Sequence, residues 1–411
     1  MTQANDQLVR QMVEQVLQHL RTGWGDRATP SQQGAVGRTA PIAKQNTGTA
    51  NLPTPKGKLG QFADVNDAVA AASAAYRALS RRSLAQREQI CQIIRDICTR
   101  QADELGRLEF EETKIGHAAH KPIKLVLAAQ VAKGVDQLRT ECFSGDHGIT
   151  LEEHAPWGVL GVLTPVTHSL PTMAVNAVQM IAAGNSLVVN PHPGGKRIAA
   201  FGAKLFNQAI YDALGIDNLI CVITEPTLES AEQIFHHRDV RLLCITGGPG
   251  AVAAAMKSGK RAICAGPGNP PVVVDASANI DNAARCIIEG TSFDNNLLCL
   301  SEKEAFVEAS VFDPLMAAMQ AAGAVKLSSQ QMDRLAEICI EPAKDAHTHL
   351  VARRKFVGAE PQFIAREIGL SIPADCRLLF GPTGPDHAFV HCEQMMPVLP
   401  VVRSDSFEQA V

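Results

Sequence analysis

The sequence predicts an α/β fold in which a doubly wound parallel sheet is followed by a second α/β series. Short apolar runs rich in β-branched residues support this, as do the helical patterns between them and a new β–α series from residue 272. Apolar strands without alternation, separated by helices, are typical of a parallel sheet covered on both faces. The expected strands are 159–163, 186–189, 219–223, 242–245 and 261–264, and the expected helices between them are 171–183, 195–213, 227–236 and 250–257.

Two segments of different character precede this body. Residues 1–21 predict an amphipathic helix, because apolar residues recur at helical spacing from Leu8 to Leu20. Residues 22–58 are rich in Gly, Ala, Thr, Gln and Pro and predict a flexible linker. So short a helix is marginally stable alone in water, so its apolar stripe needs a partner, either the chain's own body or another protein. The body then begins with helical patterns at 65–78, 84–100 and 102–112 and a short bridge at 148–153.

Composition and charge exclude several classes of protein. Lys plus Arg number 38 and Asp plus Glu 42, and the net charge of −4 argues against binding to nucleic acid or an anionic membrane. No apolar run approaches the ~20 residues that span a bilayer, and the chain opens without a signal peptide. The 11 cysteines show no CxxC pairs or zinc-ligand spacing. We therefore expect no metal site, no disulfide framework and a soluble protein in a reducing compartment.

Three turns follow predicted strands, at 164–168, 190–196 and 246–250. Each opens a helix whose positive end favours an anion, and glycine lets backbone N–H groups approach a phosphate closely. None matches a strict GxGxxG, so any single turn is better explained as an ordinary connection between a strand and a helix. Because carboxyl ends of parallel strands share one edge of a sheet, the three together favour a nucleotide-like ligand. His168 and His192 lie in two of these turns.

Cys299 is the candidate nucleophile. It follows a helical stretch at 279–289 and a polar turn, and it precedes an expected strand at 305–307. A thiolate there would be competent if its pKa were depressed, although a bland structural role is the alternative. Glu393 is a carboxylate before an apolar run, with a capping or solvated role as its alternative. Other cysteines fall within apolar periodic runs and are expected to be small buried hydrophobes: Cys91, Cys98, Cys221, Cys244 and Cys264.

Several longer motifs, taken together, resemble the aldehyde dehydrogenase superfamily. The resemblance is greatest to its acylating, CoA-dependent branch in bacterial microcompartments for propanediol and ethanolamine utilisation, the propionaldehyde and acetaldehyde dehydrogenases. The resemblance covers nearly the whole chain, and the matching segments occur in the same order as in the family. The strongest matching segments are 153–159, 182–186, 190–193, 245–250, 265–275, 292–299 and 393–400.

The resemblance implies a domain organisation and a cellular setting. A Rossmann-type NAD- and CoA-binding domain would span 59–264, and an α/β catalytic domain 265–411. Residues 1–21 would be an encapsulation peptide that docks on a microcompartment shell protein, with 22–58 as its linker. The enzyme would then lie in the lumen of a microcompartment within the cytoplasm. The family's C-terminal end is expected to be missing, including a segment that completes the oligomerisation sheet, so a homo-oligomer is expected only with that end.

The resemblance also implies a reaction, the oxidation of a short-chain aldehyde to acyl-CoA with NAD⁺ and coenzyme A. Cys299 would attack the aldehyde, hydride would pass to NAD⁺, and CoA would take the acyl group from the resulting thioester. The Cys299 N–H and a donor from the 164–168 turn would hold the oxyanion. Thr167 and His168 are the expected catalytic residues of that turn, and His168 replaces the family's usual asparagine. The residues expected to bind the cofactors are Thr164, Pro165, Asn190, His192, Pro193, Thr246, Gly247, Gly248, Gly266, Gly268 and Glu393.

Two alternatives to this reaction stay open. Hydrolytic aldehyde dehydrogenases carry a glutamate that activates the deacylating water, and Ala265 occupies its place here, which favours transfer to CoA. A hydrolytic enzyme is nevertheless one alternative. The other is a C-terminally truncated, inactive cargo protein that retains only shell docking. The sequence does not choose among acetaldehyde, propionaldehyde and lactaldehyde, or between NAD and NADP.

Overall fold

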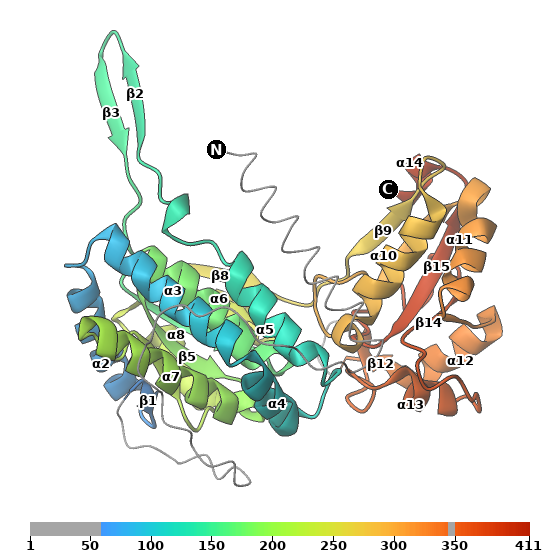
Figure 1. The fold of residues 1–411 in the computed structure, drawn as a ribbon, viewed down its shortest axis with the longest axis horizontal. Coiled ribbons are helices and arrows are strands. Elements are labelled where there is room, and N and C mark those ends of the chain that lie inside the picture. Colours follow the sequence, from blue (N-terminus) through green and yellow to red (C-terminus); the bar gives the residue numbers. More distant parts are fainter. Residues whose placement is uncertain (1–58, 344–349) are drawn as a thin grey trace, which may run out of the picture. The chain divides into compact units, whose positions relative to one another are not determined.

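A six-stranded parallel sheet forms the first half of the fold (Figure 1). The computed structural model describes residues 59–343 and 350–411, so the expectations for 1–21 and 22–58 lie outside the described residues. The strand order of this six-stranded sheet is β1-β6-β5-β4-β7-β8, and every neighbouring pair is parallel. The strands are β1 (Gln61–Phe62), β4 (Val159–Thr164), β5 (Ser186–Pro191), β6 (Ile220–Ile223), β7 (Val240–Thr246) and β8 (Ala262–Ala265).

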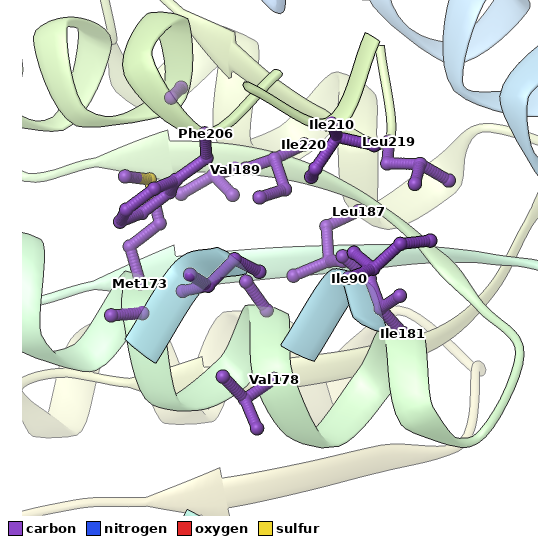
Figure 2. Close-up of a cluster of buried hydrophobic side chains, with 14 of the residues drawn as sticks. Ile90, Met173, Val178, Ile181, Leu187, Val189, Phe206, Ile210, Leu219 and Ile220 are labelled. Carbon is purple, nitrogen blue, oxygen red and sulfur yellow. The ribbon is translucent and has the colours of Figure 1, made fainter. Parts of the chain in front are cut away.

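Helices cover both faces of this sheet, as the apolar strands predict. On one face α2, α8 and α9 pack against the strands, and on the other lie α6 and α7, with α3 and α5 packed over them. Figure 2 shows the second of these cores, where Ile181 and Phe206 meet Leu187 and Val189 of β5. The helices are α2 (Val65–Leu79), α3 (Leu84–Arg100), α4 (Ala102–Thr113), α5 (His120–Val131), α6 (Ser169–Ala182), α7 (Lys196–Leu214), α8 (Leu228–His236) and α9 (Pro249–Lys257).

A second parallel sheet, of five strands in the order β11-β14-β15-β10-β9, carries the rest of the chain. Apolar side chains of α10 and α11 form its first core, and those of α12 and α13 form its second. Its strands are β9 (Pro271–Val274), β10 (Glu304–Glu308), β11 (Val325–Lys326), β14 (Leu379–Thr383) and β15 (Val398–Ser404). The remaining elements are α10 (Ile280–Ser292), α11 (Ala309–Ala321), α12 (Ser329–Cys339), α13 (Pro361–Arg366), α14 (Phe407–Ala410), β12 (Ile340–Pro342) and β13 (Leu350–Ala352).

The predicted α/β fold is confirmed, and two local expectations are wrong. The expected bridge at 148–153 is strand β3 (Gly148–Glu152), which pairs antiparallel with β2 (Glu141–Gly145) in an exposed hairpin (Figure 1). Gly148 permits the turn, because its φ of +133° is accessible mainly to glycine. Cys244 and Cys264 are half-buried rather than buried. Cys264 lies on β8, which is an edge strand of its sheet, and Cys244 lies on the neighbouring strand β7.

Asn185 joins the end of α6 to the start of β4. Its side-chain oxygen accepts hydrogen bonds from Trp157 N (2.7 Å) and Gly158 N (3.0 Å). Its amide nitrogen donates to Met180 O at 3.1 Å. The residue is buried, so the two backbone N–H groups depend on its side chain rather than on water. Asn185 therefore fixes where the central strand of the first sheet begins.

Replacing Asn185 by alanine should lower the free energy of unfolding by about 2 kcal/mol, because buried backbone groups lose their partners. Asn185→Asp keeps the oxygen acceptor and should destabilise less. Denaturant unfolding followed by circular dichroism measures both variants. Equal stability of Asn185→Ala and the parent protein would show that the side chain does not hold this junction.

Candidate active site

The three predicted turns meet at one edge of the first sheet. β4 lies between β5 and β7, and all three strands run in the same direction. The backbone N–H of His192 donates to Thr164 O at 2.9 Å, and that of Gly247 donates to Ala265 O at 3.1 Å. From β4 the chain continues to β5 on one side and later to β7 on the other, so the strand order reverses here. Such switch points are where doubly wound sheets bind ligands.

The turn after β7 fits a phosphate group. Gly248 is the N-cap of α9, with Pro249 at the first helical position and no side-chain cap. A Cβ atom added at Gly248 would meet nothing within 4 Å, so the start of the helix is open. Close by in the sheet, the buried hydroxyl of Thr164 finds no hydrogen-bond partner within the described residues. An uncovered helix N-terminus with bare glycine backbone suits an anion.

Two other predicted ligand residues serve the turns themselves. The amide of Asn190 donates to Thr227 O at 3.3 Å and accepts from Ser230 Oγ at 2.7 Å, which fastens the start of α8. His192 Nδ1 accepts a hydrogen bond from Gly194 N at 3.0 Å. Pro165 and Pro193 shape the backbone at the ends of β4 and β5. A cofactor role for these four residues stays a prediction.

The segment 293–299, here called the nucleophile loop, has an unusual backbone. Asp294, Asn295 and Asn296 have φ values of +51°, +54° and +59°, in the left-handed region that only a few per cent of non-glycine residues enter. Asp and Asn tolerate it best, because their short polar side chains bond locally. Asn295 donates to Gly358 O at 3.0 Å and Asn296 to Glu302 O at 3.2 Å. These bonds hold the bend that leads to Cys299.

Lys303 binds the same loop through hydrogen bonds to its backbone. Its side chain is fully buried, and its ammonium donates to Leu298 O at 2.8 Å and to both the backbone and side-chain oxygens of Asn296. Gln394 in turn donates to Lys303 O at 2.6 Å and to Val398 O at 3.0 Å. The loop is thus tied to the beginning of β15.

Cys299, Gly268 and Glu393, three of the residues expected at the site, lie close to one another, and their roles stay a prediction. A Cβ atom at Gly268 would lie 2.2 Å from the Cys299 carbonyl oxygen, so only glycine fits against the nucleophile loop. The Glu393 carboxylate faces the Gly268 backbone N–H. Gly266, by contrast, approaches only Val252, at 3.8 Å for an added Cβ. Three of the predicted residues therefore share one half-buried site.

The electrostatics around Cys299 keep its sulfur protonated. Burial raises the pKa of the thiol, the charge of Glu393 raises it further, and Lys303 opposes both. Burial also lowers the pKa of Lys303 to about 8 and raises that of Glu393. The depressed thiol pKa that a preformed thiolate requires is therefore absent from this arrangement.

Sequence reasoning missed the buried charge that anchors the other end of the loop. Asp294 is fully buried, and its Oδ2 lies 3.0 Å from Lys121 Nζ and 2.5 Å from Lys124 Nζ. Its Oδ1 accepts from His117 N, and its own N–H donates to His120 Nδ1, both at 2.9 Å. The only signal in the sequence is a pair of lysines three apart in the otherwise apolar α5.

Lys124 connects this carboxylate to the turn after β4. Its ammonium lies 2.9 Å from Thr167 O and 3.2 Å from His168 Nδ1. Burial, and then the charge of Lys124, hold the pKa of His168 well below its usual value, so the ring is neutral. Asp294 of the nucleophile loop and the predicted oxyanion donors Thr167 and His168 are therefore joined through one lysine.

The described part of the chain contains no group of three or more His, Cys, Asp or Glu residues that could hold a metal ion. All 11 cysteines of the chain are free. Among the described residues, no helix is both long and apolar enough to cross a membrane.

Comparison with known proteins places this arrangement in a family. The model of the aldehyde dehydrogenase family matches residues 50–411. The acetaldehyde dehydrogenase (acetylating) EutE of Salmonella typhimurium is 41% identical over 355 residues, which cover 86% of this chain and 75% of that protein.

Two solved structures have the same fold. A propionaldehyde dehydrogenase of Rhodopseudomonas palustris, with bound CoA and an acylated cysteine, has a TM-score of 0.79 at 36% identity, covering 86% of this chain and 80% of that one. A propionaldehyde dehydrogenase from the fucose utilisation microcompartment of Clostridium phytofermentans has a TM-score of 0.80 at 38% identity, covering 85% and 79%. With the family model matching from residue 50 onward, the chain belongs to the aldehyde dehydrogenase family.

Proposed function

We propose that this chain oxidises a short-chain aldehyde to acyl-CoA through a thioester on Cys299. The observation that carries the proposal is Cys299 at the end of a fastened loop, against Gly268 and within the field of Glu393. The acylating relatives support it, since one of them carries bound CoA and an acylated cysteine. The alternative of an inactive cargo protein explains neither the buried Lys303 nor the bent loop that leads to Cys299.

The proposed chemistry begins with loss of the Cys299 proton to water. The sulfur attacks the carbonyl carbon, a C–S bond forms, and the aldehyde oxygen becomes an oxyanion. The Cys299 N–H and His168 hold this oxygen, and such donors commonly contribute 10²–10³-fold in rate. Bound NAD⁺ would supply the acceptor for the hydride that leaves this carbon, and loss of the hydride would restore the C=O bond as a thioester on Cys299. The CoA thiol then attacks, and Cys299 leaves as acyl-CoA is released.

The proposed cofactor contacts follow the sheet edge. Thr246, Gly247 and Gly248 would face phosphate groups at the start of α9, where the backbone is open. Glu393 would accept from a ribose hydroxyl, because its carboxylate already lies over the Gly268 backbone. The division into a cofactor domain at 59–264 and a catalytic domain at 265–411 belongs to this proposal.

Transfer of the acyl group to CoA rather than to water is favoured by the residue at the end of β8, Ala265. Ala265 ends that strand and brings no carboxylate to the position where hydrolytic relatives have their base. General-base assistance is worth roughly 10²–10⁴-fold, so hydrolysis of the thioester should be slow without it. A thiol is far more acidic and nucleophilic than water and needs less help.

We further propose that residues 1–21 dock the enzyme on a microcompartment shell protein, which would place it in the lumen. Its support is the apolar stripe of the segment, the linker that follows and the microcompartment origin of one relative. Homo-oligomer formation belongs to the same set of proposals.

Without CoA, NADH formation should stop at about one equivalent per active site, because the thioester persists. Adding CoA should restore steady turnover, and Cys299→Ala should form no NADH. Absorbance of NADH in a stopped-flow instrument measures all three. Cys286→Ala, which removes an exposed cysteine of α10, is the matched control and should behave like the parent protein. Steady turnover without CoA would instead identify a hydrolytic enzyme.

The rate of Cys299 alkylation by iodoacetamide should keep rising with pH up to and beyond pH 9. Burial and the Glu393 charge disfavour the thiolate, so its midpoint lies above the ordinary thiol value of 9.0. Peptide mass spectrometry follows the Cys299 peptide, with N-acetylcysteine as the reference thiol. A rate that reaches its plateau below pH 8 would contradict the electrostatics described above.

Deletion of residues 2–21 should leave the activity and the thermal midpoint unchanged, since the composition of 22–58 predicts a linker between this segment and the body. Co-purification with microcompartment shells should be lost. Size-exclusion chromatography with shell protein, together with a thermal melt, measures both effects. A midpoint lowered by several degrees would assign the segment to the core instead.

A further inference from the structure

Within the described residues, the ring of His168 has a side-chain hydrogen-bond partner at Nδ1, and that partner is an ammonium group. Lys124 Nζ lies 3.2 Å from Nδ1 of the ring. The same Nζ forms an ion pair with the Asp294 carboxylate, at 2.5 Å. Lys124 is buried, so water does not compete strongly for these contacts.

An ammonium group can only donate hydrogen bonds. Nδ1 of His168 must therefore accept from Lys124, and it carries no proton of its own. Since the ring is neutral, its single proton resides on Nε2. The His168 side chain thus presents an N–H donor on the side of the ring away from Lys124.

The Thr167 carbonyl makes this arrangement depend on Lys124. It now accepts from Lys124 Nζ at 2.9 Å, and it also lies within hydrogen-bond reach of the His168 ring. If the lysine were removed, Nδ1 could carry the proton and donate to that carbonyl. Nε2 would then present a lone pair, which repels an oxyanion instead of holding it.

We propose that Lys124, anchored by Asp294, is a positioning residue that fixes His168 in its Nε2–H form for donation to the oxyanion at Cys299. This inference rests on the proposed function of the chain. It explains how a histidine can stand where the resembling family usually has asparagine. An asparagine amide always carries donor hydrogens, whereas a neutral imidazole needs a neighbour to decide which nitrogen donates.

Lys121 offers a matched control. Its ammonium lies 3.0 Å from the same Asp294 oxygen and is equally buried, but no hydrogen bond joins it to His168. Lys124→Met and Lys121→Met each remove one positive charge from the same carboxylate. Only the first should disturb the histidine, while both should lower the thermal midpoint by similar amounts.

We expect Lys124→Met to lower kcat for CoA-dependent aldehyde oxidation by about 10²–10³-fold, because one oxyanion donor is lost. KM for the aldehyde should change little, since the oxyanion exists only after attack. Lys121→Met should lose less than about 3-fold. Equal losses of kcat in the two variants would overturn the proposal.

A second background separates positioning from simple structural support. In His168→Asn, which carries an amide donor with no alternative tautomer, adding Lys124→Met should lower kcat by less than about 3-fold. If the lysine substitution has the same effect in both backgrounds, Lys124 acts through the fold and not through His168. The single variant His168→Asn supplies the reference activity.

The tautomer itself can be observed without any turnover. In protein labelled with ¹⁵N-histidine, the His168 signals are identified by their loss in His168→Asn. We expect a protonated Nε2 and an unprotonated Nδ1, and a protonated Nδ1 in Lys124→Met. An unprotonated Nε2 in the parent protein would overturn the inference. Absence of CoA-dependent NADH in the parent protein would instead refute the proposed function and leave this spectroscopic result to decide the tautomer.

Discussion

The buried carboxylate of Asp294 is the constraint on which the rest of the site depends. An unpaired charge in a protein interior costs several kcal/mol, so this one persists only because two ammonium groups and a backbone N–H meet it. Those partners come from α5 and from the segment before it, whereas Asp294 belongs to the nucleophile loop. One ion pair therefore fixes the loop, and through Lys124 it also fixes the turn that carries His168.

A third buried lysine, Lys303, acts at the other end of the loop. Lys303 holds the carbonyls of Asn296 and Leu298, and its charge favours the Cys299 thiolate that burial and Glu393 disfavour. The same burial that keeps the thiol protonated also strengthens every hydrogen bond offered to an oxyanion. The site is thus arranged for charge that develops during the reaction, and less for charge on the resting nucleophile.

The sequence predicts the parts of this site that local pattern can reveal. The strands of the first sheet follow from apolar runs, and Cys299, Gly268 and Glu393 follow from motifs. The Asp294 network could not be predicted, because it joins residues 170 and 173 positions apart and two helical lysines ordinarily indicate a solvated face. The partial exposure of Cys264 could not be predicted either, because the sequence does not indicate that β8 is an edge strand.

The position of the acyl group tests most directly whether the nucleophile loop presents Cys299 to the aldehyde. The protein would be mixed with propionaldehyde and NAD⁺ in the absence of CoA, quenched in acid, digested and analysed by peptide mass spectrometry. The account predicts one acyl group on the peptide that contains Cys299 and none on the peptides of the remaining cysteines. An acyl group on another residue, or an unmodified Cys299 while NADH accumulates, would contradict it.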